Sequence, residues 1–232
     1  MSGALRIGIV DSGAAAASGH PGRRFLAGAD GGVETREGLD DRLGHGSAVG
    51  RLIGAAAPEA RVIHAQVFGA RFTTSPALVA AGLDWLCGQG VALVNMSFGL
   101  RADRAVLRAA CRAAAARGVL LVAAAPAQGP PCYPAAYPGV LAVTGDARCL
   151  AGEVSDLQGR QAELGTWCAS PERGGGAISG ASAAAAHFTG LAARLLLEQP
   201  DVKAEAVLAH FRAAAAYSGP ERVAGGQASP AR

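Results

Sequence analysis

The chain has 232 residues, half of them hydrophobic, and a formal net charge of +3 at pH 7. This length and composition predict one domain with a single substantial core. The arginines are scattered along the chain instead of clustered, which argues against a nucleic-acid-binding protein. Because no apolar run reaches the roughly 18–20 residues needed to span a bilayer, we expect no membrane insertion.

The cysteines are odd in number and lack CxxC spacing, which argues against a disulfide framework and against a zinc site. They are Cys87, Cys111, Cys132, Cys149 and Cys168. The first six residues do not show the charged and apolar regions of a signal peptide. Reduced thiols and this amino-terminal pattern lead us to expect a cytoplasmic protein.

Apolar segments alternate with amphipathic ones along most of the chain. We predict strands at residues 5–10, 61–68, 91–96, 119–124 and 140–144. We predict helices at residues 46–57, 75–89, 103–117, 182–199 and 202–217. Strands alternating with helices of 10–15 residues indicate an α/β fold with a mostly parallel central sheet and helices on both faces.

Two further segments are defined by composition. Residues 12–43 form the longest connection and contain many glycines and charges, so we expect a surface excursion there. We assign residues 1–218 to a single domain, and the glycine- and proline-containing residues 219–232 to a flexible tail.

Three side chains beside glycines could perform chemistry. Asp11 ends the first predicted strand, where α/β sheets place catalytic groups. His45 lies between Gly44 and Gly46 at the start of a predicted helix, and these glycines leave its imidazole uncovered. Ser182 opens a long helix, whose backbone N–H groups and positive dipole end can stabilise an oxyanion. Taken singly, the three also fit a turn residue, an ordinary histidine and a helix cap.

A carboxylate, an imidazole and a hydroxyl are the groups that nucleophilic acyl transfer requires. Their order, Asp-His-Ser, and their motifs resemble the subtilisin-like serine peptidase family. Asp11 falls in its V-x-D-S/T-G motif, His45 in its H-G-T/S-x-V-A/G motif and Ser182 in its G-T-S-M-A-x-P-H motif. The resemblance covers residues 5–216. It implies the three-layer subtilisin fold and a serine endopeptidase that acts on a peptide or protein through an acyl-enzyme.

The resemblance also implies two walls of a peptide-binding cleft. One wall would be an exposed strand edge that pairs with an extended peptide, and the other would line the first specificity pocket. The residues are Ser97, Phe98 and Gly99 in the first wall and Ala124, Ala125 and Pro126 in the second.

The chain departs from the family where the oxyanion is stabilised. Pro126 and Ala127 replace a Gly-Asn pair, so the asparagine donor is absent; in subtilisin, removing it costs about 10²–10³ in turnover. The backbone N–H of Ser182 remains available, and Asn95 and Gln128 are candidate substitutes. No carboxylate cluster has calcium-loop spacing, so we predict no metal and no cofactor.

These departures, the short distance from His45 to Ser182 and the expected lack of a propeptide favour a slow, narrow-specificity processing protease. Among subtilases the chain resembles the small intracellular type that removes a leader during maturation of quinohemoprotein amine dehydrogenase, which implies one dedicated precursor. Two alternatives remain open: an impaired subtilase that binds or escorts a peptide, and a transpeptidase or macrocyclase using the same triad.

Overall fold

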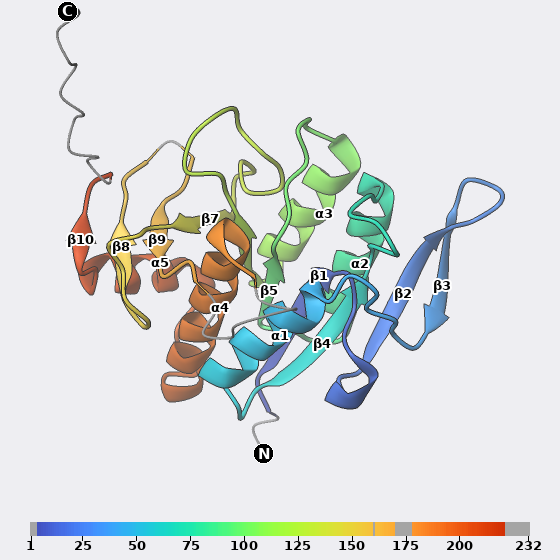
Figure 1. The fold of residues 1–232 in the computed structure, drawn as a ribbon, viewed down its shortest axis with the longest axis horizontal. Helices are drawn as coiled ribbons and strands as arrows, with labels where there is room; N and C mark the ends of the chain where they lie inside the picture. Colours follow the sequence, from blue (N-terminus) through green and yellow to red (C-terminus); the bar gives the residue numbers. More distant parts are fainter. Residues whose placement is uncertain (1–3, 160, 170–177, 221–232) are drawn as a thin grey trace, which may run out of the picture.

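A computed structural model describes residues 4–159, 161–169 and 178–220 (Figure 1). The described residues form one ten-stranded sheet in the order β10-β8-β9-β7-β6-β5-β1-β4-β2-β3. All neighbouring strands are parallel except the pairs β2–β3 and β8–β9. The strands are β1 (Arg6–Asp11), β2 (Gly22–Ala27), β3 (Val33–Glu37), β4 (Arg61–Gln66), β5 (Leu93–Met96), β6 (Leu120–Ala124), β7 (Val140–Gly145), β8 (Val154–Asp156), β9 (Leu164–Thr166) and β10 (Tyr217–Ser218).

Helices cover both faces of this sheet, as the sequence predicts for an α/β fold. They are α1 (His45–Ala56), α2 (Pro76–Gly88), α3 (Ala105–Ala116), α4 (Gly180–Glu198) and α5 (Ala204–Ala213), with a short 3-10 turn η1 (Ala16–Ser18). The five predicted helices and five predicted strands are all present, with shifted ends; α5 is the most shortened. Five strands were not predicted: β2 and β3, and the strands β8, β9 and β10, which are only two or three residues long.

The sheet separates two hydrophobic cores. One core lies between the sheet and α2 and α3, and the other lies between the sheet and α1, α4 and α5. Alternate residues of β1 contribute to the two cores: Ile7 and Ile9 pack in the second, and Val10 packs in the first. Because β1 is buried on both faces, its near-continuous apolar run was a reliable strand signal.

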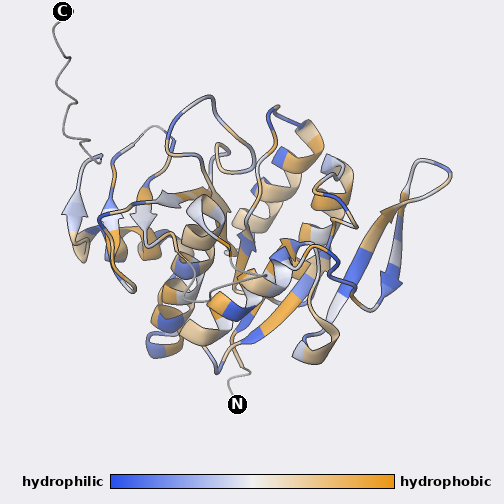
Figure 2. Ribbon diagram, viewed as in Figure 1, coloured by the Kyte–Doolittle hydropathy of each residue, from blue (hydrophilic) through white to orange (hydrophobic). Residues whose placement is uncertain are grey.

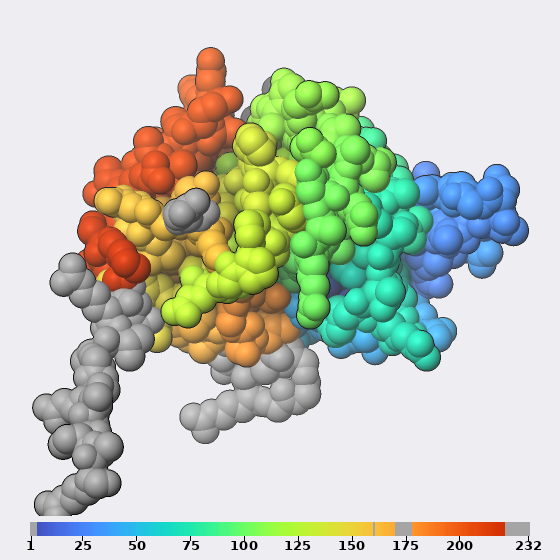
Figure 3. Space-filling model, turned by 90° about the horizontal axis from the view of Figure 1, so that it is seen from above, coloured from blue at the N-terminus to red at the C-terminus, as the bar shows by residue number. Residues whose placement is uncertain are grey.

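The prediction of a simple surface excursion at residues 12–43 is wrong in part. β2 joins the sheet beside β4, and its Phe25 is only 3% exposed in the core. Every residue of the outer strand β3 is exposed, and the hairpin formed by β2 and β3 projects from one end of the molecule (Figures 2 and 3). The sequence signal for β2 was weak because Phe25 is its only buried residue, so the strand shows no run of apolar positions.

The carboxyl ends of β1, β4 and β5 meet at one edge of the sheet, because these three strands are parallel neighbours. Asp11 is the last residue of β1, and α1 and α4 pack side by side over the same region. Gly219 and Pro220 follow β10, and residues 221–232 of the predicted tail lie outside the described residues.

Candidate active site

Asp11 and His45 form a hydrogen-bonded pair at this edge. His45 Nδ1 lies 2.8 Å from Asp11 Oδ1 and 3.0 Å from Oδ2. The carboxylate is 1% exposed and the imidazole 16%. A Cβ atom at Gly46 would lie 2.2 Å from the carbonyl oxygen of Gly13, so only glycine lets the start of α1 pack directly on the turn after β1. This close approach brings the imidazole to the carboxylate.

A second carboxylate, Asp41, holds the same two segments together and was missed in the sequence. It accepts hydrogen bonds from Ser12 Oγ at 2.7 Å, from the Gly44 N–H at 2.8 Å and from the Ser47 N–H at 2.7 Å. Ser12 Oγ in turn accepts from the Gly46 N–H at 2.9 Å. An aspartate shortly before a helix start is a capping signal, which could have identified Asp41.

Burial and the two carboxylates act on the pKa of His45 in opposite directions. Burial of the imidazole lowers its pKa, but the hydrogen bond from Nδ1 to Asp11 and the charges of Asp11 and Asp41 outweigh this effect, so the pKa is raised. Burial raises the pKa of Asp41, but the hydrogen bonds from Ser47, Ser12 and Gly44 outweigh it and leave that pKa lowered.

Ser182 is the third residue of α4, and its hydroxyl is turned toward β5. Ser182 Oγ donates to the carbonyl oxygen of Ser97 at 3.0 Å, while Ser97 Oγ lies 3.2 Å from the Ser182 carbonyl oxygen. Ile9 of β1 pairs with Asn95 of β5, and Asp11 and Ser97 each follow that pair by two residues. The fold therefore brings Ser182 to the strand end beside Asp11, although within the described chain no hydrogen bond joins it to His45.

A series of buried hydrogen bonds between β5 and α4 supports the position of Ser97 and Ser182. The Asn95 Nδ2 amide donates to Ser97 Oγ at 2.9 Å, and the Thr189 hydroxyl lies 3.0 Å from Asn95 Oδ1. Asn95 and Thr189 are fully buried, and Ser97 is 3% exposed. Asn95 and Ser97 are therefore buried, whereas Phe98 is half-buried and Gly99 is exposed; the pairing of residues 97–99 with an extended peptide and the role of Asn95 as a substitute donor stay predictions.

The start of α4 has few capping interactions among the described residues. Its N-cap residue, Ser179, makes no side-chain capping bond, and the Gly180 N–H is bonded to the Cys168 carbonyl oxygen at 2.8 Å. Within the described residues no hydrogen bond engages the Ser182 N–H. Ala127 and Gln128 are exposed, and alanine offers no side-chain donor.

The second predicted wall borders a cavity of about 430 Å³, lined by Ala125, Pro126 and Cys132 among others. Ala124 is buried at the end of β6. Cys132 Sγ lies 3.7 Å from the Ala124 carbonyl oxygen, and a Cβ atom at Gly99 would lie 3.0 Å from it. The Cys132 thiol thus lies between the two predicted walls, and no motif in the sequence predicts this position.

An aromatic cluster stands on the other side of the imidazole. Phe72 is 61% exposed, and its ring meets His45 edge to face at 5.4 Å between centroids. Phe68 links Phe72 to the half-buried Phe98, at 6.1 and 5.4 Å respectively. The exposed ring of Phe72 offers apolar contact to a peptide bound beside His45.

Within the described residues, no group of three or more His, Cys, Asp or Glu side chains is placed to hold a metal ion. In the same part of the chain, no helix combines the length and apolar character required to cross a membrane.

The model of the subtilase family matches residues 5–227. Subtilisin Savinase from Lederbergia lenta is 32% identical over 150 residues, which are 60% of this chain and 54% of that protein. Minor extracellular protease Epr from Bacillus subtilis is 33% identical over 152 residues, 60% of this chain and 23% of that protein. The match thus spans about a quarter to a half of the length of these two curated relatives.

Solved structures share the fold. A cold-adapted subtilisin-like serine proteinase has a TM-score of 0.69 and 20% identity, over 90% of this chain and 81% of that one. Fervidolysin from Fervidobacterium pennivorans has a TM-score of 0.66 and 24% identity, over 86% of this chain and 37% of that one. These matches confirm the predicted subtilisin-like α/β fold.

Proposed function

Because the chain belongs to the subtilase family, we propose that it is a serine endopeptidase with Ser182 as nucleophile, His45 as general base and Asp11 as the group that orients the imidazole. The observation that carries the proposal is the bond between the His45 imidazole and the buried Asp11 carboxylate at 2.8 Å. That bond places the proton on Nδ1 and leaves Nε2 free to accept the proton of a hydroxyl.

In the proposed mechanism the Ser182 side chain rotates before it reacts. The Ser182 hydroxyl leaves the Ser97 carbonyl and turns to His45 Nε2, which accepts its proton as Oγ bonds to the substrate carbonyl carbon. The imidazolium then gives this proton to the departing amine, and the C–N bond breaks to form an acyl-enzyme. Water, deprotonated by His45, releases the acyl group and restores Ser182.

We assign few donors to the negative oxygen of the tetrahedral intermediate. They are the Ser182 N–H and the positive end of α4, because Ala127 has no side-chain donor. We therefore assign slow turnover to this enzyme. Pro126 and Cys132 line the cavity beside the second predicted wall and limit the side chains that it can accept, which supports narrow specificity. Such specificity fits an enzyme that removes a leader from one dedicated precursor.

The proposal includes a cytoplasmic location, which separates this chain from the relative named as an extracellular protease. It is supported by the five cysteines, all of which are free thiols in the structure. Fractionation of the producing cells tests this part: recovery of the protein outside the cytoplasm would overturn it.

Labelling with a fluorophosphonate tests the nucleophile. We expect the reagent to attach to Ser182, Ser182→Ala to prevent labelling, and Ser179→Ala, a nearby serine at the start of the same helix, to label normally. An unlabelled but folded protein would favour the peptide-binding alternative. Mass spectrometry of the products then separates hydrolysis, which adds one water, from transpeptidation or cyclisation, which joins the acyl group to an amine.

A further inference from the structure

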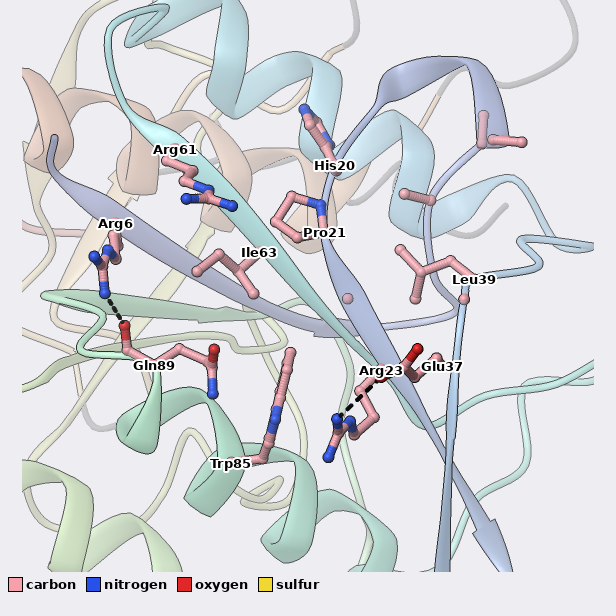
Figure 4. A pocket seen from close by; sticks show the side chains of 15 residues that line it. Arg6, His20, Pro21, Arg23, Glu37, Leu39, Arg61, Ile63, Trp85 and Gln89 are labelled. Atoms are coloured by element: carbon pink, nitrogen blue, oxygen red, sulfur yellow. Dashed lines mark hydrogen bonds and ion pairs between the residues drawn. The ribbon is translucent and has the colours of Figure 1, made fainter.

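A cavity of about 760 Å³ opens at the amino-terminal ends of β1 and β4, on the face of the sheet that α2 covers. Its lining includes Arg6, Arg23, Arg61, Trp85 and Gln89 (Figure 4). Arg6 and Asp11 stand at opposite ends of β1, so the part of the cavity beside Arg6 lies about 16 Å along the strand from the candidate active site.

The strand register concentrates positive charge here. Arg6 and Arg61 are direct partners in the β1–β4 pair, so two guanidinium groups project from neighbouring positions. Arg23 lies on the adjacent strand β2, with its guanidinium 5.7 Å from the centre of the Trp85 ring. Figure 4 shows these side chains around one hollow, with Arg6 and Arg61 on one side of Trp85 and Arg23 on the other.

Few protein groups neutralise these charges. Arg6 donates to the Gln89 carbonyl oxygen at 2.6 Å, which uses one of its five N–H groups. Arg23 lies 3.8 Å from Glu37, the one carboxylate of the lining, and that glutamate side chain is 92% exposed. The Arg61 guanidinium makes no hydrogen bond or ion pair with any described residue. His20 is also in the lining, with its Nδ1 3.2 Å from His64 Nε2, and burial lowers the pKa of His20, which favours the neutral imidazole.

We propose that this cavity binds a small multivalent anion, a polycarboxylate or a phosphate, between the guanidinium groups of Arg6, Arg61 and Arg23. Guanidinium forks match the paired oxygens of carboxylate and phosphate, and adjacent forks favour a ligand with more than one negative group. The cavity has the volume of a small-molecule site, and Trp85 provides an apolar wall. The site is separate from the proposed peptidase centre.

Binding can be measured without catalysis. The chain has two tryptophans, so the Ser182→Ala, Trp167→Phe double variant leaves Trp85 as the sole indole and prevents self-cleavage. This protein is titrated with citrate and with inorganic phosphate at constant ionic strength, followed by Trp85 fluorescence and by calorimetry. We expect at least one of these two anions to bind saturably and acetate not to saturate the protein. Adding Arg61→Gln to the double variant should weaken the binding of that anion about tenfold or more.

Arg112→Gln is the matched control, because it removes the same charge from an exposed position on α3. If citrate binds and phosphate does not, the ligand is a polycarboxylate; the reverse result assigns a phosphate. Equal effects of Arg61→Gln and Arg112→Gln, or a signal that follows only ionic strength, would overturn the proposal.

Discussion

The two halves of the candidate active site are held by different kinds of interaction. The half that contains His45 is built from charged groups: Asp11 binds the imidazole, and Asp41 ties the turn after β1 to the start of α1. The half that contains Ser182 is built from neutral groups, which run from Thr189 through Asn95 and Ser97.

This difference separates electrostatic tuning from positioning. Carboxylates near an imidazole change its pKa, whereas hydroxyls and amides fix geometry with little effect on charge. Changes in the charged half should therefore move the pH dependence of catalysis. Changes in the neutral half should alter rate or stability and leave the pH dependence in place.

The largest expected effect is the loss of the triad itself. Ser182→Ala should lower turnover by about 10⁶. Asp11→Asn should lower it by about 10⁴, because the imidazole would be held in the wrong tautomer. Peptide hydrolysis and thermal unfolding are measured together, and unchanged unfolding confirms that the fold is intact. Full activity in Ser182→Ala would refute the assignment of the nucleophile.

The oxyanion site should give the next largest effect, in the direction of faster catalysis. Ala127→Asn alone should do little, because Pro126 fixes φ near −65° where glycine could adopt other values. Pro126→Gly with Ala127→Asn should accelerate hydrolysis of a small activated ester, with a ceiling of about 10²–10³. If the unmodified protein is already fast and neither variant is faster, another group supplies the donor.

Asp41→Asn tests the electrostatic half. Losing this charge should lower the pKa of His45, because Asp41 raises it. The base must be neutral, so the acid limb of kcat/KM should move to lower pH, while the plateau falls about tenfold as the start of α1 loosens. Asp40→Asn is the control, since that carboxylate pairs with Arg42 at 2.6 Å and does not bond the turn. An acid limb that stays in place would contradict the assigned role of Asp41.

Thr189→Val tests the neutral half and should have the smallest effect on catalysis. Valine keeps the shape but removes the hydroxyl that lies 3.0 Å from Asn95 Oδ1 and 2.8 Å from the Ala185 carbonyl oxygen, which should lower the free energy of unfolding by about 1–3 kcal/mol. Turnover should fall less than tenfold, with no shift of the acid limb. Urea unfolding is measured in the Ser182→Ala background, and Thr35→Val on the exposed strand β3 is the control. A shifted acid limb would show that the hydrogen-bonded groups Thr189, Asn95 and Ser97 also change the pKa of His45.

Much of the fold could be predicted because it depends on patterns along the chain. Buried parallel strands such as β1 and β6 are continuous apolar runs, and the helices between them have ten or more residues. The short strands at the β10 end of the sheet could not be predicted in this way, because β8 and β10 are stabilised by their neighbours in the sheet instead of by their own composition. For the same reason Phe25 became a core residue inside a segment rich in charge and glycine.

The sequence by itself determined the chemistry of the candidate site: Asp11, His45 and Ser182 stand in motifs whose glycines allow close backbone approach, as the contact between Gly46 and Gly13 shows. Only the tertiary structure decided what surrounds them. Asp41, Phe72 and Cys132 reach the site through contacts between segments far apart in sequence, and the turn of the Ser182 hydroxyl toward Ser97 depends on where β5 ends. Such contacts leave no local pattern, because folding selects them by proximity in space.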